Sequence, residues 1–213
     1  MIGAYGLSIP ESLKEVCDPS RSALIIYDMQ VGIVSQVSEG PQIVERCAKL
    51  LAAARTRSLR VIFTRHFFLP NQAAGVGQIR RAMIWQRQPD PHKLKPIMAQ
   101  GSSSFQIVEQ LEPREGEVLS DKVTMSAFES TFLNIALRDT GLNTFLIAGI
   151  AMEVGIEPTV RHGLDLNFVP VVVTDACGSR SAELKERSLS TLEQTGEVVL
   201  ATTEEVVAAL AAN

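Results

Sequence analysis

The chain has 213 residues, a length that suits one domain with a sizeable core. Hydrophobic residues make up 46% of it and charged residues 21%, with a formal net charge of −4. This balance is typical of a soluble globular protein, and it argues against a nucleic-acid-binding protein and against a membrane-surface protein, since no Lys/Arg block is present.

The sequence also lacks the marks of export and of cofactor binding. Residues 1–21 contain no apolar signal-peptide core, and no run of 18 apolar residues follows, so we expect neither a signal peptide nor a membrane span. The three cysteines, at positions 17, 47 and 177, are odd in number and widely spaced, which favours the reducing cytoplasm over a disulfide framework. The sequence contains no CxxC or HExxH motif, and no GxGxxG motif follows the first predicted strand. We therefore predict no metal and no cofactor.

Short apolar runs alternate with helical patterns along the chain. The first, Ser22–Tyr27, is too short and too continuously apolar for an amphipathic helix, and it predicts a buried strand. Pro41 then opens a helix, a favoured position for proline. The apolar residues from Ile43 to Ala54 recur on one face of this helix, and Cys47 lies among them as a core residue.

Further strands and helices follow in alternation. Strands are predicted at Leu59–Thr64, Val118–Ser120, Thr144–Gly149, Pro170–Thr174 and Glu197–Ala201. Helices are predicted at Phe128–Arg138, from near Gly155 through Pro158–Leu166, at Ala182–Thr195 and at Thr203–Ala212, the last capped by Thr203 with two glutamates behind it.

This alternation predicts an α/β fold: a three-layer αβα sandwich around a mainly parallel, six-stranded, Rossmann-like sheet. We expect residues 1–213 to form one domain. Ligands of such sheets bind beyond the carboxyl ends of the strands. That edge carries Asp28, the segments 64–66 and 120–122, and the turn that follows Gly149.

One segment, about residues 67–104, shows no clear periodicity and is predicted to be a long loop insertion. Such loops are usually lids, binding loops or assembly arms. Its basic residues, with Arg80 and Arg81 among them, would suit an anionic substrate. The alternative interpretation is an excursion at a subunit interface, and we expect a homo-oligomer, a dimer or a tetramer.

Two charged residues end strands at this edge. Asp28 closes the apolar run in IIYDMQ, and Lys122 ends the third strand in SDKVTMSAF. Lys122 could pair with Asp28 and hold it ionised, or orient its proton for acid–base chemistry. Alternatively, Asp28 is only a cap for the segment that follows it.

From Ser22 to about Val199, the sequence resembles the isochorismatase-like hydrolases, a superfamily that includes nicotinamidases, N-carbamoylsarcosine amidases and isochorismatases. The resemblance rests on LIIYDMQ, VIFTRH, DKVTMSAFESTFL, AGIAMEVGIEPT and LDLNFVPVVVTDACGS, in this order along the chain. It implies a hydrolase that acts on a small molecule, with Asp28 and Lys122 as catalytic residues.

In the amidase branch of that superfamily, a cysteine at the start of a helix attacks the carbonyl carbon, and a helix N-terminus favours its thiolate. The resemblance places Gly155 at that position. It also implies a cis peptide bond between Ile150 and Ala151, in a turn that aims backbone N–H groups into the pocket as an oxyanion hole. Cys177 lies beyond the fifth strand and does not align with the missing nucleophile.

The isochorismatase branch also has glycine at this position and hydrolyses a vinyl ether without a covalent enzyme intermediate. The resemblance places His66 where that branch has a substrate-binding glutamine, and Arg80 or Arg81 where it has a carboxylate-binding arginine. The other substrate-binding residues that we predict are Trp85, Phe128, Ile150, Ala151 and Gly155.

The turn departs from the isochorismatase pattern, which has a tyrosine and a histidine where this chain has Ala151 and Glu153. Isochorismate itself is therefore not the expected substrate. Glu153 could be an added catalytic carboxylate, or it could bind backbone N–H groups near the start of the helix.

Three functional hypotheses remain at this point. The favoured one is non-covalent hydrolysis of a small anionic metabolite, of the vinyl-ether type, with Asp28 as general acid or base. The second is hydrolysis of an amide or ureide by activated water. The third is a catalytically silent family member that binds a metabolite.

Overall fold

The structure is a computed structural model that describes residues 1–212. Its central sheet has six strands in the spatial order β5-β4-β3-β6-β7-β8, and every neighbouring pair is parallel. The strands are β3 (Ser22–Tyr27), β4 (Arg60–His66), β5 (Val118–Lys122), β6 (Thr144–Ile150), β7 (Val169–Gly178) and β8 (Val199–Ala201). The predicted six-stranded α/β fold is confirmed.

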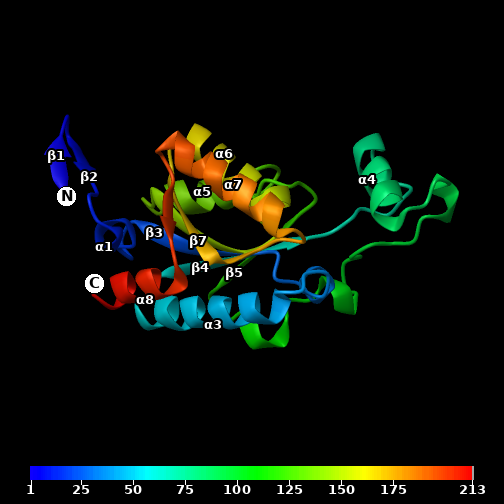
Figure 1. The fold of residues 1–213 in the computed structure, drawn as a ribbon, viewed down its shortest axis with the longest axis horizontal. Helices are drawn as coiled ribbons and strands as arrows, with labels where there is room; N and C mark the ends of the chain where they lie inside the picture. Colours follow the sequence, from blue (N-terminus) through cyan, green and yellow to red (C-terminus); the bar gives the residue numbers. More distant parts are fainter. Residues whose placement is uncertain (213) are drawn as a thin grey trace.

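Helices cover both faces of this sheet (Figure 1). On one face lie α1 (Leu13–Val16), α3 (Gly40–Thr56) and α8 (Thr203–Ala211), which contribute to the first apolar core cluster. On the other lie α5 (Leu133–Arg138), α6 (Glu157–Asp165) and α7 (Ala182–Thr195), which belong to the second. All six residues of β3 are buried, because this central strand is covered on both faces.

Two predicted helix starts are wrong. The helix expected from Phe128 begins at Leu133, because the preceding segment is a turn in which the Thr124 hydroxyl donates to the carbonyls of Ser126 and Glu129. Such side-chain bonds to the backbone compete with helix formation. The cap of the last helix is Thr202, not Thr203, since the Thr202 side chain accepts the Glu205 N–H.

Several elements are absent from the predictions, among them the short helices α1 and α2 (Val31–Val34). Residues 1–9 include an antiparallel hairpin of β1 (Ile2–Ala4) and β2 (Leu7–Ile9). The expected long loop contains α4 (Val76–Gln86), which Figure 1 shows at some distance from the layers of the sheet. Ala82 is the only buried residue of α4, whereas Val76, Ile84 and Trp85 are exposed, so the apolar residues of this helix do not mark one buried face.

The strand order places a ligand site between β3 and β6. From β3 the chain adds β4 and β5 on one side, and from β6 it adds β7 and β8 on the other, so the order reverses between these two strands. In open α/β sheets, ligands bind at such a switch point beyond the carboxyl ends. Asp28 follows β3 directly, and the turn at Ala151 follows β6. No helix among residues 1–212 is long and apolar enough to cross a membrane.

Candidate active site

Asp28 and Lys122 form a buried ion pair at the switch point. Lys122 Nζ lies 2.7 Å from Asp28 Oδ2. The Thr64 hydroxyl donates to Asp28 Oδ1 at 2.6 Å and accepts the Asp28 backbone N–H at 3.1 Å. Asp28 has a φ of +48°, in the left-handed region that aspartate tolerates better than most residues. Both carboxylate oxygens are thus held by donors from β4 and β5.

The environment of this pair shifts both pKa values. Burial raises the pKa of Asp28, while contact with Lys122 and Thr64 opposes that rise. Burial lowers the pKa of Lys122, and the charge of Asp28 opposes that change. Burial therefore disfavours the charged form of each group, while the contact between them favours the charged form of both.

Tyr27 occupies the space beside Gly155. The Tyr27 hydroxyl accepts a hydrogen bond from Lys122 Nζ at 2.9 Å and donates to the Met125 carbonyl. A Cβ built on Gly155 would lie 2.5 Å from Cζ of Tyr27 and still closer to the hydroxyl oxygen. Because Tyr27 is buried and tied at both of these contacts, any side chain at position 155 requires the ring to move.

The turn after β6 begins a helix next to these groups. The Ile150–Ala151 peptide bond is cis. Ala151 is the N-cap of the π-helix η4 (Met152–Ile156), which continues directly into α6, and no side chain caps this end. The first N–H groups of a helix have no intrahelical partner and favour negative charge. The turn therefore offers hydrogen-bond donors at one edge of the site.

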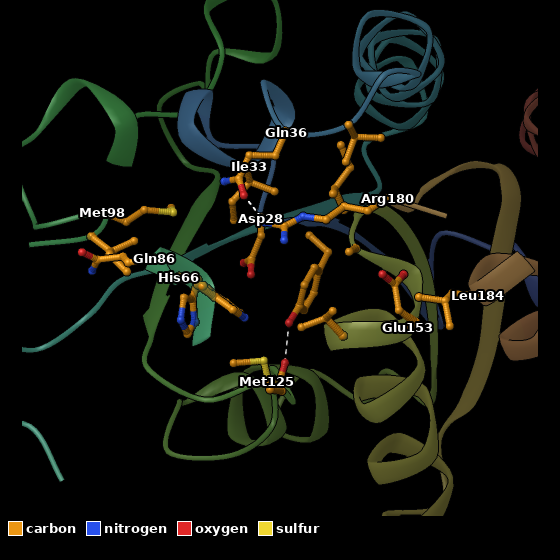
Figure 2. A pocket seen from close by; sticks show the side chains of 17 residues that line it. Asp28, Ile33, Gln36, His66, Gln86, Met98, Met125, Glu153, Arg180 and Leu184 are labelled. Atoms are coloured by element: carbon orange, nitrogen blue, oxygen red, sulfur yellow. Dashed lines mark hydrogen bonds between the residues drawn. The ribbon is translucent and has the colours of Figure 1, made fainter. Parts of the chain in front are cut away.

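A cavity of about 500 Å³ opens onto Asp28. Figure 2 shows Asp28 and His66 on one side of it, Glu153 on the opposite side and Arg180 between Gln36 and the centre. It is lined by Tyr27, Asp28, Ile33, Gln36, Val37, His66, Trp85, Gln86, Ile97, Met98, Met125, Ile150, Ala151, Glu153, Val154, Arg180 and Leu184. Its volume suits a small organic ligand.

His66 enters the cavity as a neutral imidazole. Burial, with the positive charges of Lys122 and Arg81, lowers the pKa of His66 to about 3, and the nearby Thr124 backbone offsets this only in part. Neither ring nitrogen makes a hydrogen bond of normal distance and angle. A neutral imidazole has one donor and one acceptor, and here both ring nitrogens are buried.

The structure divides the predicted substrate-binding residues into two groups. His66, Trp85, Ile150 and Ala151 line the cavity. Gly155 is not part of the lining and lies behind it, against Tyr27.

The other three do not face the cavity. Arg80 is exposed on α4, and Arg81 lies over the rings of Phe68 and Trp85, at 5.2 and 5.8 Å. Phe128 packs in the second core cluster, with its ring stacked on Phe168. These arginines and this aromatic ring have packing or solvent contacts instead of cavity contacts.

Sequence reasoning missed several lining residues. Tyr27 was assigned only to a strand, although the phenol next to Asp28 in IIYDMQ was a possible signal. Arg180 follows β7, and nothing in the local sequence indicated that its side chain reaches the cavity. The expectation that Glu153 binds backbone N–H groups is wrong, because its buried Oε2 has no hydrogen-bond partner in the structure.

The cysteines lie away from this cavity. Cys17, Cys47 and Cys177 are free and buried, and the cavity lining includes none of them. The Cys177 Sγ lies 3.7 Å from the Ile147 carbonyl, and burial raises the pKa of this thiol to about 12. A thiol with such a pKa is almost entirely protonated at neutral pH and is a poor nucleophile.

The comparisons with known proteins agree with this architecture. The protein-family model of the isochorismatase domain matches residues 22–204 of this chain. Ureidoacrylate amidohydrolase RutB of Klebsiella pneumoniae is 31% identical over 183 residues, which are 78% of this chain and 76% of that protein. RutB of Pantoea ananatis is 27% identical over 185 residues, 80% of this chain and 74% of that one.

A solved structure of a family member has the same fold. The crystal structure of a cysteine hydrolase from Pseudomonas syringae pv. phaseolicola aligns with a TM-score of 0.78 and 25% identity, covering 91% of this chain and 94% of that one. The protein belongs to the isochorismatase family and is a hydrolase of that family.

Proposed function

We propose that this hydrolase cleaves a small substrate by direct attack of water, with Asp28 as the group that moves the proton and with no covalent bond to the enzyme. The observation that carries the proposal is the placement of Tyr27 against Gly155. The phenol fills the space that a side chain at position 155 would need, while the Asp28–Lys122 pair remains beside the cavity. The site therefore keeps its acid–base group without room for a thiol.

The bond that we favour is the C–N bond of an amide or ureide. This choice is supported by the amidohydrolase relatives and by the uncapped helix start at Ala151. Asp28 takes a proton from water, and the water oxygen attacks the carbonyl carbon. The resulting oxyanion receives hydrogen bonds from the turn. The C–N bond then breaks, and Asp28 returns its proton to the leaving nitrogen.

A second candidate is hydrolysis of a vinyl ether, the reaction that the sequence favoured. It needs Asp28 in the protonated form, because the proton adds to the vinyl carbon before water attacks the oxocarbenium ion. The raised pKa of Asp28 supports this candidate. The two reactions require opposite protonation states of the same carboxyl group.

A panel of amides, ureides and vinyl ethers tests the proposal, with the wild type and Asp28→Asn compared on each compound. Water-activated amide hydrolysis requires the carboxylate, so its rate should fall as pH drops through the raised pKa of Asp28. Vinyl-ether cleavage requires the acid, so its rate should fall as pH rises through the same pKa. Turnover of none of the compounds would favour the third hypothesis, a silent metabolite-binding protein.

The remaining expectations stay proposals. Homo-oligomer formation is supported by the apolar residues Val76 and Ile84, which are 78% and 70% exposed on α4. Light scattering of the purified chain tests it, and a monomeric mass would reject it. A reducing cytoplasmic location is supported by the three buried free thiols.

A further inference from the structure

We propose that Tyr27 is a positioning residue, whose hydroxyl keeps Lys122 an ammonium ion directed at Asp28. Tyr27 thereby decides where the proton of the buried pair lies. With the proton on Lys122, Asp28 is a carboxylate; with the proton on Asp28, both groups are neutral. The inference rests on the proposed function, in which the carboxylate form of Asp28 takes a proton from water.

Three oxygen atoms surround Nζ of Lys122. They are Asp28 Oδ2 at 2.7 Å, the Tyr27 hydroxyl oxygen at 2.9 Å and the Thr124 carbonyl oxygen at 3.2 Å. An ammonium group has three N–H donors, so each oxygen receives one of them. A neutral amine has only two N–H donors and would leave one of these oxygens without a donor. The number of acceptors therefore matches the charged form of Lys122.

The Tyr27 hydroxyl acts toward Lys122 as an acceptor only. Its own hydrogen lies in the bond to the Met125 carbonyl, and a carbonyl has no hydrogen to donate in return. The phenol oxygen therefore presents a lone pair to Nζ, and Lys122 must supply the hydrogen of that bond. Burial raises the pKa of Tyr27 above its usual value, so the phenol keeps its hydrogen at neutral pH.

The turn after β5 holds the Met125 carbonyl in place. Two residues further on, the Ala127 N–H donates to the Thr159 hydroxyl at 3.0 Å. That hydroxyl in turn donates to the Gly155 carbonyl at 2.7 Å. These bonds join the turn to α6 and η4, the elements next to the Tyr27 ring. The Met125 carbonyl is thus fixed beside the phenol and keeps the phenol hydrogen in their shared bond.

Burial makes the position of this proton sensitive to the hydroxyl. Lys122 and Asp28 are 0% and 5% exposed, and a low dielectric favours the neutral form of each. Burial lowers the pKa of Lys122, the contact with Asp28 opposes this change, and the positive charge of Arg81 adds to it. His66, the other titratable group nearby, is neutral. Because removal of the Tyr27 hydroxyl alters none of these groups, it isolates the effect of one hydrogen bond to the ammonium.

Tyr27→Phe tests the inference, since it removes the hydroxyl and keeps the ring, whose centre lies 4.3 Å from Nζ. We expect the pKa of Lys122 to fall by about one to two pH units, which corresponds to the loss of one hydrogen bond to a charged group. NMR titration of ¹⁵N-labelled lysine side chains measures this pKa, and Lys122→Met assigns the signal. Tyr5→Phe, at an exposed tyrosine, is the matched control and should leave the pKa unchanged. An unchanged or higher pKa in Tyr27→Phe would overturn the inference.

The wild type gives a second test that needs no variant of Tyr27. At neutral pH the Lys122 nitrogen should have the chemical shift of an ammonium group, with hydrogens that exchange slowly with water because the group is buried. The chemical shift of a neutral amine would overturn the inference, even if Tyr27→Phe failed to fold. A purely structural role of the hydroxyl would lower the stability of Tyr27→Phe without moving the pKa of Lys122, and this result would also reject the inference.

These measurements need no substrate, so the two proposals can fail separately. A Lys122 pKa that does not respond to Tyr27→Phe, in a protein whose turnover depends on Asp28, would reject only the role of Tyr27. The expected response in a protein whose turnover does not depend on Asp28 would reject only the proposed mechanism.

Discussion

Nζ of Lys122 lies 2.7 Å from Oδ2 of Asp28, and the two side chains are 0% and 5% exposed. A carboxylate so deeply buried costs several kcal/mol of solvation unless a cation and hydrogen-bond donors hold it. Lys122 and Thr64 supply both. Asp28 still lines the cavity. A group that exchanges protons with a ligand must have this position.

Asp28→Asn should lower turnover by about 10²–10⁴-fold, because the amide keeps the shape of the carboxyl but cannot take up or release the proton. The measurement is kcat on the best compound of the substrate panel. Asp165→Asn, an exposed position on α6, is the control and should be unaffected. Near-normal turnover of Asp28→Asn with unchanged folding would remove this residue from the mechanism.

Gly155→Ala should lower the free energy of unfolding by about 1–3 kcal/mol, because the added methyl overlaps the Tyr27 ring. In a Tyr27→Ala background the same change should cost much less, since the space is then open. A double-mutant cycle of urea unfolding measures this coupling, expected at about 0.5–3 kcal/mol. Additive effects of the two changes would show that the ring does not limit position 155.

Cys177→Ser should leave turnover largely intact, because this thiol is buried against the Ile147 carbonyl, outside the cavity. Iodoacetamide should likewise fail to abolish activity in the folded protein, since burial raises the pKa of the thiol to about 12. Activity that disappears in step with alkylation of Cys177 would contradict this expectation.

His66 should make the protein sensitive to acid. Its pKa is lowered from 6.5 to about 3 in the folded chain, so the unfolded chain binds more protons between these values. The contribution of His66 to stability is therefore complete above pH 6.5 and is lost as pH falls toward 3. From pH 7 to pH 5, urea unfolding should show a loss about 2 kcal/mol larger in the wild type than in His66→Phe. The same loss of stability in both proteins would show that His66 does not cause the acid sensitivity.

Much of the fold could be predicted because local patterns and tertiary packing agree. The run Ser22–Tyr27 is a buried strand in the structure with the predicted bounds, and the helix Ala182–Thr195 also has its predicted bounds. The meeting of Asp28 and Lys122 could be anticipated as well, since parallel strands present their carboxyl ends at one edge. In both cases the period of the sequence and the topology of the sheet were sufficient.

What could not be predicted depends on contacts between distant segments. The Tyr27 ring reaches Gly155 only because η4 starts beside the end of β3, and no local pattern reports that approach. Arg180 reaches the cavity from beyond β7, and Trp85 from α4. Phe128 was expected near the substrate, but its ring packs against Phe145 and Phe168 in the core. Side-chain direction at these positions is set by packing.

The proposed hydrolysis proceeds without an intermediate that is covalently bound to the enzyme. Intact-mass measurement of wild-type protein, acid-quenched during turnover of the best substrate of the panel, tests this most directly. We predict product in the quenched solution and only the unmodified mass of the chain at every time point. A chain whose mass is increased by the acyl portion of the substrate, appearing and decaying at the rate of turnover, would contradict the account.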